Sequence, residues 1–334
     1  MDGAPGPQEV RQRILELSTS VWAFAALSFA LEAGVLDEAS KPSTAGQISQ
    51  RTGIPEDLVN GVLDVLVALG FGSVDEQGFV ASLGLDAVTR GRAKETLSAD
   101  LRSTRLQTAD LVERATRGTI ALDGWSSPDP KLLEAQGLHS AQMVVPWVEL
   151  LFPHLEGLPE RLREPTARFL DVGSGVGRLS IEMCRRFPNL QVVGIDPFET
   201  ALTLARRNVA EAGLGDQIEL RPERVQDLTD ERCYDLAWVP VLFMAAHVAA
   251  RGVHRVHTAL RPGGWAVLGS LAVDGSEIQP AALRLKSLLY GSGGLLPEHA
   301  AAMLTAAGFD NVLALPAMPG VGQRTIVGRR PVDE

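Results

Sequence analysis

The sequence has little cysteine, with only Cys184 and Cys233 among its 334 residues. Two cysteines so far apart argue against a disulfide framework and a zinc knuckle, and we expect both to be buried thiols in a reducing compartment. Positive charge is also scarce, because 31 lysines and arginines face 41 aspartates and glutamates and the net charge is −10. Binding to nucleic acid depends on clustered basic residues, so this balance argues against a nucleic-acid partner and favours a small molecule.

Long hydrophobic runs are missing as well. The longest, Val21 to Leu31, is about half of what a helix needs to cross a bilayer. Residues 1–7 have neither the basic start nor the apolar stretch of a signal peptide. We therefore expect a cytoplasmic protein with no membrane partner. Apolar residues still make up 45% of the chain, which is enough for a sizeable core and, at this length, for two domains.

What the sequence does contain is a glycine-rich turn at residues 173–177. The apolar strand Phe169-Leu170-Asp171-Val172 precedes it, and a helical pattern begins at Arg178. Glycines allow positive φ angles and let a ligand approach the backbone, while the helix start offers unpaired N–H groups and a positive dipole end. Many such turns are tight for packing reasons alone, so a structural role is the alternative at this point.

A second buried strand at residues 190–195 favours the ligand-binding interpretation. It ends on Asp196, at the spacing of about 20 residues expected for an acid that binds a ribose. The first motif begins with an acid, Asp171, and lacks the last two-residue step of G-x-G-x-x-G. It therefore fits NAD poorly.

From residue 164 onward, short apolar strands alternate with helical patterns. This alternation predicts a doubly wound parallel sheet, with ligands bound at the carboxyl ends of its strands. The expected strands are 168–172, 190–195, 218–221, 234–239, 265–270, 311–314 and 324–328, and the expected helices include 201–212, 247–260 and 297–307. The glycine turn and Asp196 both lie at strand ends, where such a sheet binds its ligand.

The N-terminal part is predicted to be a separate, helical domain. A helix is expected from Gln8 to about Ala33, and its stretch 21–31 is apolar nearly all round, so it needs cover from a partner subunit or from the other domain. Helix starts near Thr44 and Pro55 and a hairpin over 71–82 complete a winged-helix pattern. Its would-be recognition helix is acidic, so we expect a dimerisation scaffold rather than a DNA-binding module.

Residues 93–163 are expected to form a helical linker with one break. The helix after the break, 131–155, places His139, Gln142 and Met143 near one face, and a linker ahead of a nucleotide domain is a natural lid over its open end. Ordinary core packing is the alternative for its methionine and tryptophan side chains. The candidate substrate-binding residues are Trp125, His139, Gln142, Met143, Trp147, Phe243 and Tyr290.

Motifs of one family match four stretches of the chain: 170–177, 193–196, 259–264, and Gly293-Gly294 followed by 306–309. Through them the chain resembles the small-molecule O-methyltransferases with an N-terminal winged-helix dimerisation domain, a branch of the class I S-adenosylmethionine (SAM) dependent methyltransferases. The resemblance implies an α/β fold with a Rossmann-like, doubly wound seven-stranded sheet ending in an antiparallel hairpin. The N-terminal domain would be all-helical apart from its wing.

The same resemblance implies SAM as the cofactor and a swapped homodimer. The expected domains are a dimerisation domain at 8–92, a helical linker and substrate lid at 93–163, and a SAM-binding catalytic domain at 164–334. By this resemblance the glycine turn wraps the methionine part of SAM, Asp196 holds the ribose, and Pro197 with Phe198 covers the adenine. The full set of expected cofactor-binding residues is Asp171, Gly173, Ser174, Gly175, Gly177, Asp196, Pro197, Phe198, Glu223, Arg224, Trp238 and Val239.

Two departures from the family stand out. The family's Gly-Asp after the third strand is absent, which leaves Glu223 or Arg224 to meet the adenine amine. Its catalytic His-Asp-Trp run after the fourth strand is replaced by Val241-Leu242-Phe243-Met244. His247 and His139 are the remaining candidates for a general base, with a structural role as the alternative for His247. No metal is expected, because neither carboxylate nor cysteine accompanies the histidines around His247 at ligand spacing.

Methyl transfer from SAM to a small, largely apolar acceptor is the leading interpretation, with a hydroxyl as the acceptor group and secondary metabolism as the setting. The missing base keeps one alternative open, in which an enzyme of the same fold uses SAM without methylation in a rearrangement, cyclisation or elimination. A winged-helix regulator that senses SAM is a third interpretation.

Overall fold

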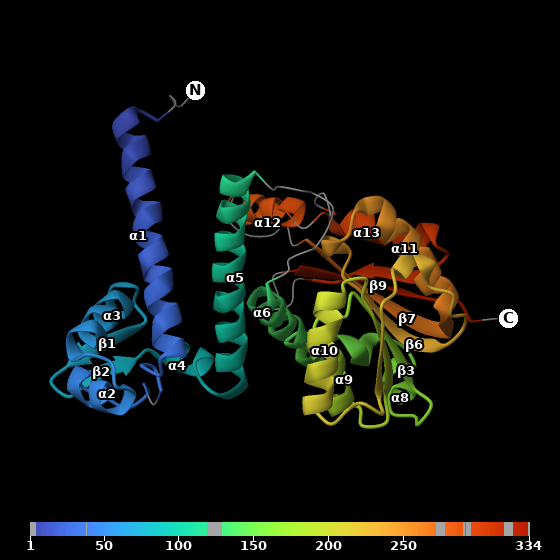
Figure 1. The fold of residues 1–334 in the computed structure, drawn as a ribbon, viewed down its shortest axis with the longest axis horizontal. Helices are drawn as coiled ribbons and strands as arrows, with labels where there is room; N and C mark the ends of the chain where they lie inside the picture. The colour runs from blue at the N-terminus through green and yellow to red at the C-terminus, as the bar shows by residue number, and fades with distance from the viewer. Residues whose placement is uncertain are drawn as a thin grey trace. The chain divides into compact units, whose positions relative to one another are not determined.

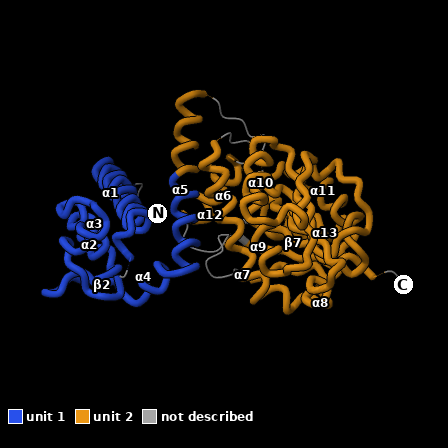
Figure 2. Tube along the Cα trace, turned by 60° about the horizontal axis from the view of Figure 1, so that its bottom comes forward, with its two compact units in different colours: residues 1–105 blue, residues 106–334 orange. Residues whose placement is uncertain are grey.

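The computed structural model describes residues 5–37, 39–118, 129–271, 278–289, 291, 295–316 and 323–332 (Figure 1). The chain divides into two compact units, Met1–Arg105 and Leu106–Glu334 (Figure 2). The boundary falls inside helix α5 (Gly91–Arg117), beyond the domain end expected at residue 92. Most of the stretch expected as a linker therefore groups with the sheet-containing unit.

The first unit is a small helical domain with one hairpin. Its elements before α5 are α1 (Pro7–Glu32), α2 (Ala45–Thr52), α3 (Glu56–Ala68), β1 (Gly72–Asp75), β2 (Gly78–Ala81) and α4 (Leu83–Val88). Thr44 and Gln47 form the capping box that starts α2, and Gly53 ends this helix with a left-handed φ of 75°. The core draws on the helices and the hairpin, with Leu31, Ile48, Leu66 and Phe79 among its members. The order of helices and hairpin is the one the sequence predicted.

Helix α1 leaves much of its apolar surface exposed. Its buried residues are Ser28, Ala30 and Leu31, near its end, whereas Val21 and Trp22 are 67% and 75% exposed. By length and composition alone, α1 is the one helix of the described chain that could cross a membrane, a test that core helices of soluble proteins also pass. Its apolar stretch needs a cover that the first unit does not supply.

The second unit contains a seven-stranded sheet with the order β5-β4-β3-β6-β7-β9-β8. Its strands are β3 (Arg168–Val172), β4 (Gln191–Ile195), β5 (Ile218–Arg221), β6 (Tyr234–Val239), β7 (Leu260–Leu271), β8 (Asp310–Ala314) and β9 (Gln323–Arg329). The first five are parallel, and β9 lies antiparallel between β7 and β8. The predicted doubly wound sheet with a terminal antiparallel hairpin is confirmed.

Helices cover both faces of this sheet (Figure 1). Helices α9 (Arg178–Arg186) and α10 (Glu199–Glu211) lie on one face, and α11 (Ala246–Ala259) and α13 (Pro297–Ala306) on the other. Side chains alternate between two cores along each strand, so Phe169 and Trp238 point into one core, and Leu170 and Val239 into the other. The carboxyl ends of β3, β4 and β6 meet at one edge of the sheet.

The segment ahead of the sheet is not the single helix expected over 131–155. It consists of α6 (Pro130–Ala141), α7 (Val144–Pro146), a π-helical turn η1 (Trp147–Leu151), a 3₁₀ turn η2 (Phe152–His154) and α8 (Leu158–Arg161). Pro146 explains the interruption, because a proline lacks an N–H and its ring clashes with the carbonyl four residues earlier, at Gln142. Helix α6 accordingly ends at Ala141.

Candidate functional site

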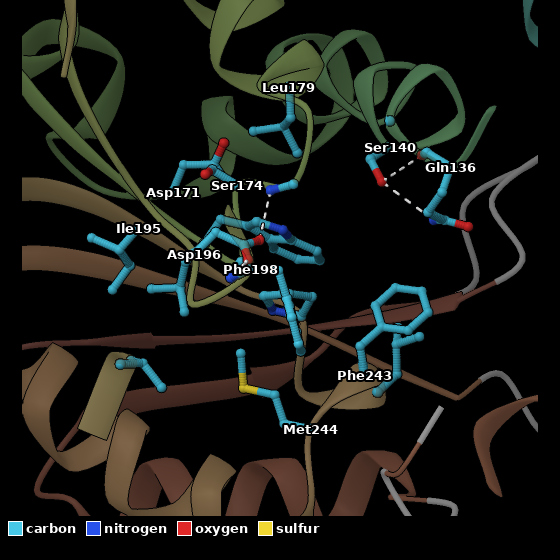
Figure 3. A pocket seen from close by; sticks show the side chains of 18 of the residues that line it. Gln136, Ser140, Asp171, Ser174, Leu179, Ile195, Asp196, Phe198, Phe243 and Met244 are labelled. Atoms are coloured by element: carbon cyan, nitrogen blue, oxygen red, sulfur yellow. Dashed lines mark hydrogen bonds between the residues drawn. The ribbon is translucent and has the colours of Figure 1, made fainter. Parts of the chain in front are cut away.

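A cavity of about 510 Å³ lies at the carboxyl ends of β3, β4 and β6, which is the size of a small-molecule pocket (Figure 3). Its walls come from the glycine turn, the strand ends, α6 and helix α12 (Ile278–Leu289), all in the second unit. Figure 3 shows Asp171, Ser174 and Asp196 on one side of the cavity and Gln136 and Ser140 on the other.

The glycine turn has a backbone conformation that other residues rarely adopt. Its three glycines, at 173, 175 and 177, have φ angles of 66°, 55° and 75°. The carbonyl of Ile195 accepts hydrogen bonds from the N–H groups of Gly173 (2.8 Å) and Ser174 (3.1 Å), which fixes the turn to the end of β4. A Cβ on Gly194 would lie only 2.9 Å from that of Ser174, so a glycine in β4 makes room for the turn.

The hydroxyl of Ser174 is buried and has no hydrogen-bond partner within the described chain. An unsatisfied buried hydroxyl costs roughly 1–3 kcal/mol. Because Ser174 lines the cavity, a polar group of a ligand would remove this cost. The turn therefore fits a ligand that brings polar groups to it.

Asp196 follows β4 and organises the backbone on both sides of it. Its carboxylate accepts hydrogen bonds from the N–H groups of Gly175 and Phe198, both at 2.9 Å. Burial raises the pKa of Asp196, and these two hydrogen bonds act against the rise. A carboxylate has about four acceptor sites, so Asp196 keeps acceptor capacity for the paired hydroxyls of a ribose.

Asp171 is the second acid of the site and is only 1% exposed. Its Oδ2 accepts a hydrogen bond from the hydroxyl of Ser180 on α9. Burial raises the pKa of Asp171 to about 7, the hydrogen bond from Ser180 opposes this rise, and the charge of Asp196 adds to it. A cationic ligand group nearby would stabilise the ionised carboxylate, which fits a cofactor with positive charges such as SAM.

Residues after β4 and β5 complete the cofactor wall. Pro197 and Phe198 line it, as do both candidates for the adenine amine, Glu223 and Arg224. Burial raises the pKa of Glu223. Trp238, at the end of β6, also lines the cavity.

The remaining walls are mostly apolar. Helix α6 contributes Gln136, His139 and Ser140, which lie at helical spacing and are the main polar groups of this wall. The apolar members are Leu133, Met143, Leu242, Phe243, Met244, Val248 and Leu283. Figure 3 shows Phe243 and Met244 away from Asp171. The cavity thus has an acidic, hydrogen-bonding end at the glycine turn, and the rest of its wall is mostly apolar with polar groups from α6 and α12.

Of the two candidate bases, only His139 borders the cavity. His247 is the second residue of α11, it is exposed, and it is not part of the cavity wall. The buried face of α11 is formed instead by Ala249, Val253 and Val256, which pack on the sheet. The structure therefore does not support the prediction of His247 as the general base. Among the described residues, no group of three or more His, Cys, Asp or Glu side chains could hold a metal ion.

Four further expected site residues lie outside the cavity wall. Gly177 caps α9 and packs toward Ala205 of α10, where an added Cβ would lie 3.4 Å away. Val239 faces the core opposite to Trp238. Trp147 is fully buried with its ring centroid 4.8 Å from that of Trp238, so the core-packing alternative holds for it. Gln142 lies just past the end of α6.

Trp125, Tyr290 and the motif glycines 293 and 294 lie outside the described residues. The sequence pointed to this part of the chain through Tyr290, but not to the α12 residues that line the cavity, Leu283, Lys286 and Ser287. The α6 residues Gly137 and Ser140 were also missed; Ser140 lies four residues after Gln136, a helical spacing that would have indicated it.

Comparisons with known proteins agree with this geometry. A family model described as a methyltransferase domain matches residues 169–264. The chain is 32% identical over 167 residues to a ubiquinone biosynthesis O-methyltransferase of Xanthomonas axonopodis pv. citri, which covers 47% of this chain and 68% of that protein. It is 31% identical over 178 residues to a release factor glutamine methyltransferase of Cereibacter sphaeroides, covering 50% of this chain and 62% of that relative. The chain therefore spans less than two thirds of the second relative.

A solved structure resembles almost the whole chain. The complex of human N-acetylserotonin methyltransferase with SAM superposes with a TM-score of 0.63 at 15% identity, covering 99% of this chain and all of that one. At this identity the likeness concerns the fold. Together with the matched domain and the Xanthomonas relative, the glycine turn and the acid after β4 give the chain its family: it belongs to the class I SAM-dependent methyltransferases and resembles their small-molecule O-methyltransferases.

Proposed function

We propose that the protein transfers a methyl group from SAM to a hydroxyl oxygen of a small, largely apolar acceptor. The observation that carries this proposal is that one cavity has acidic groups at the glycine turn and, away from Asp171, the apolar side chains of Phe243 and Met244. The name of the Xanthomonas relative, an O-methyltransferase of ubiquinone biosynthesis, supports oxygen as the acceptor atom. Secondary metabolism remains our proposed setting.

SAM supplies an electrophilic methyl group on a positively charged sulfur. Asp196 and the glycine turn would hold the nucleoside and the amino acid part of SAM, and the apolar side chains of the wall would exclude water and orient the acceptor. Orientation of this kind is worth roughly 7–11 kcal/mol without any acid or base. Transfer of the methyl group to a hydroxyl oxygen would form an oxygen–carbon bond, break the carbon–sulfur bond and release the hydroxyl proton. We assign its removal to His139, the histidine on the cavity wall.

A second candidate function rests on the missing base after β6. The turn η4 (Val241–Phe243) and Met244 contain no ionisable side chain at that position. In this alternative the same cavity binds SAM as a structural or electrostatic element, and the acceptor undergoes a rearrangement, cyclisation or elimination.

Methyl-labelled SAM separates the two functions. Purified protein is incubated with the labelled cofactor and a panel of phenols and quinols. Methyl transfer predicts label in the product and one S-adenosylhomocysteine (SAH) formed for each methylated molecule. Product formation with all label still in SAM would establish the alternative and exclude methyl transfer.

We also propose a homodimer that covers the exposed apolar stretch of α1. Val21 and Trp22 are large apolar side chains that the chain leaves open to solvent, and exposed apolar patches of this kind mark interaction sites. The cytoplasmic location and the absence of a nucleic-acid or membrane partner stay predictions from the sequence.

A further inference from the structure

Glu134, on the side of α6, accepts hydrogen bonds from three side chains of two other helices. Its Oε2 accepts from Nε (3.1 Å) and Nη2 (3.0 Å) of Arg178, the first residue of α9. Its Oε1 accepts from Nη2 of Arg207 and from Nδ2 of Asn208, both on α10 and both at 2.9 Å. Each carboxylate oxygen thus receives two hydrogen bonds, three of the four from guanidinium groups, which are the strong kind.

Asn208 closes these contacts into a ring and attaches the ring to the glycine turn. It is 1% exposed, and its Oδ1 accepts from Nη2 of Arg178 at 3.1 Å. Its Nδ2 also donates to the carbonyl of Val176 at 2.9 Å. Val176 lies inside the glycine turn, between Gly175 and Gly177. One buried amide therefore connects the carboxylate of α6 to the backbone of the cofactor turn.

Apolar contacts bring α6 and the turn together at the same place. A Cβ on Gly137 would lie 2.2 Å from Cγ2 of Val176, so α6 approaches the turn as closely as only a glycine allows. Leu133, Val176 and Ala201 form a small buried cluster beside this contact. The turn and α6 are therefore in direct van der Waals contact.

The same helix carries the polar wall of the acceptor end. Gln136, His139 and Ser140 lie on the cavity side of α6, whereas Glu134 does not line the cavity and faces α9 and α10. A change in the glycine turn has a direct route to these three residues through Asn208 and Glu134.

We propose that Glu134 is a positioning residue that couples occupation of the glycine turn by the cofactor to the ordering of α6, and so to formation of the acceptor wall. A ligand in the turn fixes the Val176 carbonyl, which fixes Asn208, Glu134 and α6 in succession. The proposal rests on the proposed function only in requiring that SAM binds at the turn. It predicts that SAM binds first and prepares the acceptor end.

The test uses the full-length protein and SAH, which binds without reacting. Hydrogen exchange of the amides in residues 130–141 is measured with and without saturating SAH, and calorimetry gives the SAH affinity. In the wild type we expect exchange of this segment to slow by about 5- to 150-fold on SAH binding, the range typical of coupling between sites. The Glu134→Gln variant, which places an amide donor opposite donors of the ring, should lose most of this slowing.

Glu211→Gln is the matched control, because Glu211 is the other carboxylate near Arg207, at 3.7 Å, and its side chain is 65% exposed. It should behave as the wild type. Glu134→Asp keeps the negative charge but places it one methylene further from the ring, so it should retain part of the SAH-dependent slowing. This variant replaces Glu134→Gln in the test if Glu134→Gln does not fold. A merely structural Glu134 would change the exchange of α6 equally with and without SAH.

The outcomes separate this inference from the proposed function. A wild type that does not bind SAH contradicts the proposed function. A wild type that binds SAH with no change of exchange in residues 130–141 overturns the coupling alone. Equal SAH-dependent slowing in Glu134→Gln and the wild type also overturns it.

Discussion

The buried carboxyl of Asp171 makes the stability of the folded protein depend on pH. Its pKa is raised to about 7 by burial, from a usual value near 3.8. Such a group keeps its proton in the folded protein while the unfolded chain has lost it, so the folded state loses stability as the pH rises from about 4 to 7. One pKa unit corresponds to about 1.4 kcal/mol.

We predict that the SAM-free protein is less stable at pH 8 than at pH 5, with roughly 3 kcal/mol of the difference due to Asp171. Asp171→Asn, which has no proton to lose, should remove that part. Urea unfolding of both proteins at the two pH values checks this. Equal differences in the wild type and the variant would show that Asp171 titrates normally in the folded protein.

The two histidines give the second prediction at this scale. His139→Ala should lower kcat by about 10²–10⁴-fold, the usual contribution of a general base, with SAH affinity unchanged. His247→Ala should leave kcat as in the wild type, because His247 is exposed on α11 and is not part of the cavity wall. Steady-state kinetics and calorimetry measure both quantities. If the two variants behave alike, His139 is not the base.

Among the elements, strands were more predictable than the helices that line the cavity. The buried strands have apolar runs bounded by turns, and β3, β5 and β6 match their expected limits. In β6 the alternation places Trp238 and Val239 in different cores, and of the two only Trp238 lines the cavity. The apolar pattern over 131–155 predicted one helix, but α6 ends at Ala141 because Pro146 cannot donate to the carbonyl of Gln142 and its ring clashes with it.

Helix α1 exposes large apolar side chains, among them Val21 and Trp22, to solvent. We predict that Trp22→Lys converts a dimer into a monomer, because it places a charge on the exposed apolar face. Ser20→Lys is the control, since Ser20 lies on the other side of the helix and adds the same charge. Light scattering during size-exclusion chromatography measures the mass. A monomeric wild type contradicts the dimer, and flotation of the wild type with lipid vesicles would show a membrane as the cover instead.

For the whole molecule, sequence reasoning identified the cofactor end of the cavity better than the acceptor end. The glycine turn and Asp196 follow from local motifs and Phe198 from the family resemblance, and all of these residues except Gly177 line the cavity. The acceptor wall is assembled from α6, η4 and α12, which are far apart in the chain and carry no shared pattern. Only the fold brings them together, so their residues were found in part, as with His139 and Phe243, or missed, as with Lys286.

The central claim is that this cavity binds SAM through the glycine turn and Asp196. Calorimetric titration of SAH into the wild type and Asp196→Asn tests it most directly, with Glu211→Gln as control. We predict one SAH per chain in the wild type and the control. In Asp196→Asn we predict that SAH binding weakens by roughly 1.5–3 kcal/mol of binding free energy, which is the typical contribution of hydrogen bonds to a charged group. Absence of saturable binding in the wild type, or equal affinity in Asp196→Asn, would contradict the claim.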